Sequence, residues 1–173
     1  VLGVNYYTSQ LLRAGEPSGQ PSPHPTAPDA VVVDRPWLDR TDMGWEVTPD
    51  AFRDLLIGLH RDYTGPAGIP LAITENGCAI DDPDPASGPI DDQQRIDYLR
   101  GHLRAVHEAI AAGAAIDTYL VWSLIDNFEW AFGYTKRFGL VAVDGELNRL
   151  PKASAGWYAE LIRTGTLCLP EQV

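Results

Sequence analysis

Residues 70–77 read Pro-Leu-Ala-Ile-Thr-Glu-Asn-Gly. The short, continuous apolar run predicts a strand buried on both faces, and Asn-Gly after it predicts a turn. Glu75 then projects from the carboxyl end of that strand, which is the edge where parallel α/β folds carry their catalytic groups. A turn with a solvated acid remains the alternative interpretation of the same residues.

Further elements alternate along the chain around this strand. An apolar start predicts a strand over residues 1–8, and the run 118–122 predicts a second buried strand. Helices are expected from a Thr48 cap to about Tyr63, from about Asp91 to Gly113, and over residues 151–163; residues 139–144 suggest a hairpin arm.

Three strand–helix units place the chain in the α/β class with a parallel sheet. A closed (β/α)₈ barrel needs eight such units and about 250 residues, so these units alone cannot close one. An open sheet of three strands leaves two unpaired edges. Because the chain also begins inside a strand, we expect upstream sequence and the remaining strands to come from elsewhere.

The composition excludes several classes of protein. The chain has 173 residues, 45% of them hydrophobic, and 13 basic against 24 acidic residues give a net charge of −11. This charge opposes binding to nucleic acid and to anionic membranes, and no apolar run approaches the roughly 20 residues of a spanning helix. We therefore expect neither nucleic acid nor a membrane as a partner.

Cysteine and histidine usage points away from metals and cofactors. Cys78 and Cys168 form no CxxC pair, which fits reduced thiols and a cytoplasmic location rather than a disulfide or zinc site. The histidines at 24, 60, 102 and 107 lack paired-ligand spacing, so we expect them in solvated or capping positions. No cofactor is expected.

A second chemical signal follows the 118–122 strand. Aromatic residues between Trp122 and Phe138 are interleaved with acidic, amide and basic side chains. Aromatic faces pack on the C–H face of a pyranose, while carboxylates and amides bond to its hydroxyls. The mixture favours a sugar site, and ordinary core packing of the aromatics is the alternative.

The motifs together resemble glycoside hydrolase family 1, the β-glucosidase family. The resemblance is carried by Leu-Gly-Val-Asn-Tyr-Tyr-Thr at 2–8, Thr-Glu-Asn-Gly at 74–77 and Trp-Ser-Leu-Ile-Asp-Asn-Phe-Glu-Trp at 122–130, continuing through 133–139. It implies that residues 1–173 are part of one TIM-barrel domain. They would be its carboxyl-terminal three βα units, strands six to eight, incomplete as given.

The resemblance also implies catalytic roles. Glu75 matches the nucleophile that forms a covalent glycosyl-enzyme, Tyr7 matches the tyrosine that hydrogen-bonds it, and Asn5 belongs to the same polar support. A retaining mechanism needs a second carboxyl group about 5–5.5 Å away. In this family it lies in an Asn-Glu-Pro motif that these 173 residues do not contain, so we expect the chain to be inactive alone.

Substrate contacts follow from the same motifs. Trp122 and Glu129 match residues that hold hydroxyls of the non-reducing sugar, Trp130 and Phe138 match the floor and the 6-hydroxyl end of the pocket, and Trp45 resembles an aglycone-side tryptophan. Phe132 stands where many members have glutamate, which leaves glucose, fucose and galactose open.

We therefore expect a retaining β-glucosidase acting on a β-glucoside or cello-oligosaccharide, with the missing amino-terminal barrel segment as its partner. Two alternatives stay open. One is a non-catalytic sugar- or partner-binding fragment, since sugar contacts are retained without the acid/base. The other is a phospho-β-glycosidase, although Glu129 would repel a 6-phosphate.

Overall fold

Three parallel strands form the central sheet in the order β1–β4–β5. The computed structural model describes residues 1–15 and 30–167. Strand β1 spans Leu2–Tyr6, β4 spans Leu71–Asn76 and β5 spans Ile116–Val121. The three predicted strands and their parallel pairing are confirmed.

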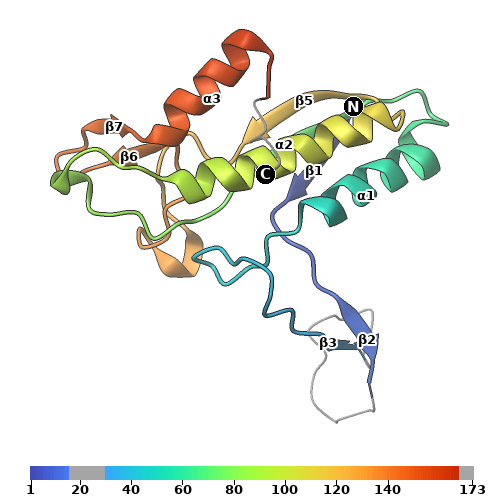
Figure 1. The fold of residues 1–173 in the computed structure, drawn as a ribbon, viewed down its shortest axis with the longest axis horizontal. Coiled ribbons are helices and arrows are strands. Elements are labelled where there is room, and N and C mark those ends of the chain that lie inside the picture. The colour runs from blue at the N-terminus through green and yellow to red at the C-terminus, as the bar shows by residue number, and fades with distance from the viewer. Residues whose placement is uncertain (16–29, 168–173) are drawn as a thin grey trace, which may run out of the picture.

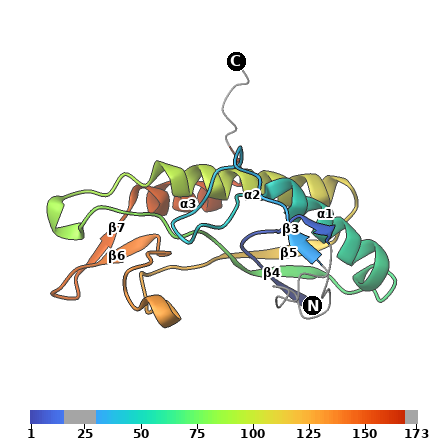
Figure 2. The same cartoon turned by 90° about the horizontal axis from the view of Figure 1, so that it is seen from below.

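All three α-helices lie on one side of this sheet (Figure 2). They are α1 (Pro49–Leu59), α2 (Gln93–Ala111) and α3 (Ala153–Thr164), and α1 continues into a π-helical turn, His60–Thr64. Apolar side chains of α1, α2, β1 and β4 form the main core between the layers, where Phe52, Leu56, Leu71 and Ile73 are fully buried. The helix predictions are confirmed to within a few residues.

The opposite face of the sheet is open, which corrects one expectation. Strand β5 was expected to be buried on both faces, but Thr118 is exposed and the Leu120 side chain is 52% exposed. Its other face packs through Ile116 and Tyr119 on the helix-side core. A continuous apolar run predicts burial on two sides, yet within the described residues no second layer covers the open face.

Two antiparallel hairpins extend from this two-layer unit (Figure 1). Strands β2 (Leu12–Ala14) and β3 (Ala30–Val32) pair beyond the end of β1. Strands β6 (Val141–Val143) and β7 (Arg149–Pro151) pair just before α3, which confirms the predicted hairpin arm.

Thr48 precedes α1 as expected, but its hydroxyl does not cap the helix. The structure shows no side-chain cap bond there. Instead Thr48 Oγ1 accepts the backbone N–H of Ser9 at 3.1 Å and lies 2.7 Å from the hydroxyl of Tyr6. The hydroxyl therefore joins the start of α1 to the end of β1.

His102 corrects the expectation of solvated or capping histidines. Its ring is fully buried on α2 and stacks on Tyr98 at a centroid distance of 3.9 Å. Burial lowers its pKa to about 4, so the ring is neutral at pH 7. His24 and Cys168 lie outside the described residues.

The part of the chain that the structure describes contains no helix long and apolar enough to cross a membrane.

Candidate functional site

Glu75 and Tyr7 meet at the carboxyl end of the parallel sheet. Glu75 is the next-to-last residue of strand β4, and Tyr7 directly follows β1. Because β1 and β4 are neighbours in the sheet, they bring the two side chains together. The hydroxyl of Tyr7 donates to Glu75 Oε2 at 2.6 Å. Hydrogen bonds of this length between a hydroxyl and a carboxylate are short and charge-assisted.

The surroundings of Tyr7 keep this hydroxyl protonated. Burial is the largest cause that raises the pKa of Tyr7 far above its ordinary value of 10.0. The bond to Glu75 and the negative charges of Glu75 and Glu129 raise it further. Tyr7 therefore remains a hydrogen-bond donor throughout the physiological range.

Asn76 is a structural anchor that the sequence analysis missed. Asn-Gly was expected to turn the chain, but Asn76 is the last residue of β4 and is fully buried. Its Nδ2 donates to the carbonyl of Tyr6 at 2.7 Å and to the Tyr98 hydroxyl at 3.3 Å, and its Oδ1 accepts from Tyr119. These neutral bonds fix the backbone that carries Glu75. The feature of the sequence that could have indicated this role is the Thr-Glu-Asn-Gly motif, in which Asn76 directly follows Glu75.

Gly77 explains how the ends of β4 and β5 come so close. A Cβ at this position would lie 1.7 Å from the carbonyl oxygen of Trp122. The backbone N–H of Trp122 also donates to the carbonyl of Asn76 at 2.9 Å. A residue with a side chain cannot fit here, so glycine allows Trp122 to lie beside the strand end of Glu75.

An aromatic cluster lines the same end of the sheet. The ring of Tyr7 lies 5.5 Å from that of Trp45 and 6.0 Å from that of Phe138, and Trp45 and Phe138 are 6.2 Å apart. Tilted and edge-on rings at these separations attract one another. Three residues predicted from distant parts of the sequence are thus brought together around the Glu75 partner.

The remaining predicted residues are placed differently. Asn5 pairs with Glu75 in the strand register, but its Oδ1 accepts from the Thr74 hydroxyl at 2.6 Å rather than contacting the carboxylate. Glu129 and Trp130 lie on the segment 123–139, here called the aromatic loop. Glu129 is partly buried, whereas Trp130 is 83% exposed and lies outside the aromatic cluster.

A lysine that the sequence analysis did not single out links two parts of this site. Lys136 Nζ lies 2.9 Å from Asp42 Oδ2, donates to the Asp42 carbonyl at 2.7 Å, and is 5.8 Å from the ring centre of Phe132. The bond ties the aromatic loop to the segment that carries Trp45. Lys136 stands in the 133–139 stretch that carries the family resemblance, but the motif did not indicate Asp42 as its partner.

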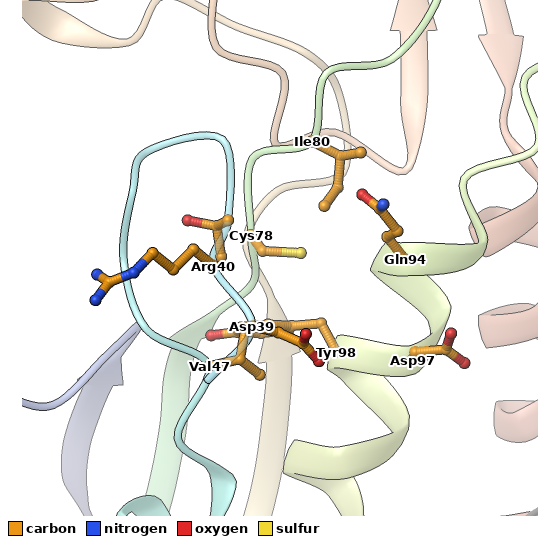
Figure 3. Close-up of a pocket in the computed structure, with 9 residues that line it drawn as sticks. Asp39, Arg40, Val47, Cys78, Ile80, Gln94, Asp97 and Tyr98 are labelled. Atoms are coloured by element: carbon orange, nitrogen blue, oxygen red, sulfur yellow. The ribbon is translucent and has the colours of Figure 1, made fainter. Parts of the chain in front are cut away.

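A separate cavity of about 270 Å³ lies between the segment 39–47 and the start of α2. In Figure 3 the sulfur of Cys78 points into this space toward α2, and the guanidinium of Arg40 points away from it. Burial raises the pKa of Cys78 to about 12, so this thiol is not ionised at pH 7. Glu75, Trp122 and Glu129 do not line this cavity.

Within residues 1–15 and 30–167, no group of three or more His, Cys, Asp or Glu residues is arranged to hold a metal ion.

The chain that carries this glutamate–tyrosine pair is similar to proteins of one family. The family model for "Glycosyl hydrolase family 1" matches residues 1–166. The chain belongs to glycosyl hydrolase family 1. The residues that suggested the resemblance, around positions 2–8, 74–77 and 122–139, therefore stand in a chain whose family membership is confirmed.

Relatives in this family are similar in sequence to nearly the whole of this chain. The chain is 45% identical to a bifunctional β-D-glucosidase/β-D-fucosidase from Bifidobacterium breve, which matches 94% of this chain and 36% of the relative. It is 40% identical to a 6-phospho-β-galactosidase from Streptococcus equi subsp. zooepidemicus over 97% of this chain and 38% of the relative.

The solved structure of a family 1 β-glucosidase from Thermotoga maritima superposes with a TM-score of 0.84 at 39% identity. The match covers 96% of this chain and 35% of that one. Like the curated relatives, this enzyme is about three times as long as the chain. The fold described above is therefore similar to part of a family 1 barrel.

Proposed function

We propose that this chain is the nucleophile-bearing part of a retaining β-glycosidase. The observation that carries the proposal is the 2.6 Å hydrogen bond from the Tyr7 hydroxyl to Glu75 at the carboxyl end of the parallel sheet. A nucleophilic carboxylate has to be held in position for attack, and the Tyr7 hydroxyl, which stays protonated, supplies a donor that does so. In this proposal residues 1–173 contribute strands six to eight of one TIM-barrel domain.

The proposed reaction has two steps. A Glu75 oxygen attacks the anomeric carbon, the bond from that carbon to the leaving oxygen breaks, and an acid/base carboxyl group protonates the leaving oxygen. Water then attacks the same carbon, the acid/base group accepts its proton, and Glu75 leaves as a carboxylate. The second carboxyl group belongs to a complementary segment in this proposal, so the chain is inactive alone.

Surface features of the sheet support the need for such a segment. Leu120 and Leu124 are more than half exposed beside the edge strand β5, and Ile162 of α3 is 69% exposed. These three residues help to line a groove of about 450 Å³ between β5 and α3. An apolar groove beside an unpaired strand edge is typical of a surface that another element covers.

The proposed substrates are glycosides with a terminal non-reducing β-D-glucosyl residue, with fucosyl and galactosyl residues as further candidates. The related enzyme from Bifidobacterium breve is named for both glucoside and fucoside activity. An unphosphorylated sugar is favoured because the partly buried carboxylate of Glu129 would repel a 6-phosphate. The free, buried thiol of Cys78 agrees with a reducing, cytoplasmic location.

The central test combines the chain with a fragment that carries the first five strands of a family 1 barrel. A 2-deoxy-2-fluoro-β-glucoside is added, and peptide mass spectrometry locates the trapped sugar. We expect the label on Glu75 and none in a Glu75→Gln variant, while Glu160→Gln on the exposed face of α3 serves as the matched control. A label on another residue would contradict the assignment.

Two other outcomes identify the alternatives. Saturable quenching of tryptophan fluorescence by cellobiose in the chain alone, with no trapped sugar in the complemented protein, would favour a non-catalytic sugar-binding role. Preference for a 6-phospho-β-glycoside over its neutral counterpart would favour the phosphoglycosidase alternative.

A further inference from the structure

Five buried charged side chains lie behind the aromatic loop. Arg95 and Lys152 carry positive charge, and three aspartates, Asp82, Asp92 and Asp126, carry negative charge. Each of these side chains is at most 12% exposed. Buried charges are costly unless they are paired, so this network has to hold its members in defined positions.

Lys152 links two aspartates of the network. It precedes α3, and its Nζ lies 2.7 Å from Asp82 Oδ2 and 2.9 Å from Asp126 Oδ1. Asp82 comes from the segment after β4, whereas Asp126 comes from the start of the aromatic loop. One ammonium group therefore joins the segments that follow both strands of the candidate site.

Asp126 closes the aromatic loop on itself. The same Oδ1 that binds Lys152 accepts the backbone N–H of Gly139 at 2.7 Å, and the N–H of Ser123 donates to the carbonyl of Phe138 at 3.2 Å. A Cβ on Gly139 would lie 2.2 Å from the backbone nitrogen of Asp126. The two ends of the loop are thus held together by backbone hydrogen bonds and by the Asp126 carboxylate, directly beside Phe138.

The charge balance makes Lys152 the critical member. Three carboxylates face two cations, and the buried Asp126 Oδ2 has no hydrogen-bond partner among the described residues. Without Lys152, Asp82 would still be paired with Arg95. Asp126 would keep, among those residues, the neutral amide of Gly139 alone.

We propose that Lys152 is a positioning residue for sugar binding. It acts through Asp126, which closes the aromatic loop and thereby fixes Phe138 against Tyr7, the partner of Glu75. The closure of the loop is independent of the reaction; the role in sugar binding rests on the proposed function. The network therefore connects the start of α3 with the catalytic edge of the sheet.

The first experiment measures amide hydrogen exchange by NMR in the chain itself. Lys152→Met should speed exchange of the Gly139 amide by about tenfold or more, because Asp126 loses the ion pair that holds its carboxylate beside this amide. The matched control is Arg163→Met, which removes a cation of the same helix from an exposed pair with Glu160. Unchanged exchange at Gly139 in Lys152→Met would overturn the proposal.

A milder variant covers the case in which Lys152→Met fails to fold. Asp126→Asn keeps an oxygen that accepts from Gly139 and leaves two cations facing two carboxylates. We expect faster exchange at Gly139 and Leu140, with no change at Leu71, whose amide bonds to Ala115 across the sheet. Equal acceleration at all three amides would show a general loss of stability and overturn the proposal.

The second experiment uses the complemented protein of the trapping test. Asp126→Asn should raise KM for an aryl β-glucoside about tenfold and lower kcat by less than threefold, whereas loss of folded protein would lower apparent kcat at unchanged KM. A fall in kcat alone would contradict the role in sugar binding. If the unsubstituted protein shows no turnover, the proposed function fails, and the exchange data still decide whether Lys152 closes the loop.

Discussion

The backbone that carries Glu75 is held by neutral hydrogen bonds, whereas the aromatic loop is held by buried ions. The strand end at β4 is fixed by Asn76, which bonds to a backbone carbonyl and to tyrosine hydroxyls. The loop after β5 is fixed by Lys152 and its aspartate partners. The position of Glu75, the proposed nucleophile, therefore depends on neutral hydrogen bonds within packed elements, while the position of the aromatic loop depends on charge.

Removal of the Glu75 carboxylate should have the largest effect. Glu75→Ala in the complemented protein should lower kcat by about 10⁴-fold or more, because it removes the carboxylate that is proposed to form the covalent intermediate. Azide should restore part of the rate by attacking the anomeric carbon from the vacated space. Steady-state kinetics with an aryl β-glucoside measures both effects, and full activity of the variant would remove Glu75 from the mechanism.

Gly77→Ala should break the contact between the two regions. The added methyl group would overlap the carbonyl of Trp122, so the ends of β4 and β5 must separate. We expect a loss of roughly 4 kcal/mol or more of unfolding free energy, or failure to fold. Urea unfolding gives the value, and Gly58→Ala on α1, where a Cβ meets no atom within 4 Å, is the control. A small effect of Gly77→Ala would contradict the close approach.

Lowering the pH should protonate the buried ring of His102 on α2, next to the neutral hydrogen bonds of Asn76 and Tyr98. The pKa of His102 is lowered by burial from 6.5 to about 4, so the unfolded chain binds the proton more readily than the folded one. Stability contributed by the neutral ring is full above pH 6.5 and falls as pH drops toward 4, by roughly 3 kcal/mol.

His102→Phe tests this pH dependence. The variant loses the bond from Nδ1 to the Tyr98 carbonyl, which costs about 1 kcal/mol at every pH, but it should lack the additional loss on acidification. Urea unfolding at pH 7 and pH 4.5 compares the two proteins. Parallel pH profiles would show that His102 does not titrate in this window.

Tyr7→Phe should have the smallest of these effects. The substitution keeps the ring contacts with Trp45 and Phe138 and removes the donor to Glu75. We expect kcat to fall about 10- to 100-fold, which corresponds to the loss of one charge-assisted hydrogen bond. Thermal unfolding should change little, and an unchanged kcat would show that the hydroxyl does not support the nucleophile.

Much of the fold could be predicted from local patterns. Apolar runs gave the three parallel strands, and periodicity gave the helices, because both depend on how side chains alternate along the backbone. The exception is β5, whose apolar run predicts two covered faces although the described residues cover one. The apolar residues of a strand reflect how many of its faces are covered in the folded protein, including faces that other segments cover.

The candidate site was predicted in part. Glu75 and Tyr7 were matched through motifs, and the structure brings them into contact. Asn76, Lys136 and Lys152 were not predicted, since each acts through a partner that is distant in the chain. Trp130 is 83% exposed, and its expected place on the floor of the sugar pocket stays a prediction.

The sequence by itself determined the class of fold and the family, and its motifs single out Glu75 as the proposed nucleophile, because motif residues and hydrophobic periodicity are local properties of the chain. The tertiary structure alone decided which side chains hold that nucleophile and the aromatic loop in place. Hydrogen bonds and buried ion pairs depend on distances of about 3 Å between atoms whose residues are tens of positions apart. Packing of α2 and α3 against the strand ends sets those distances.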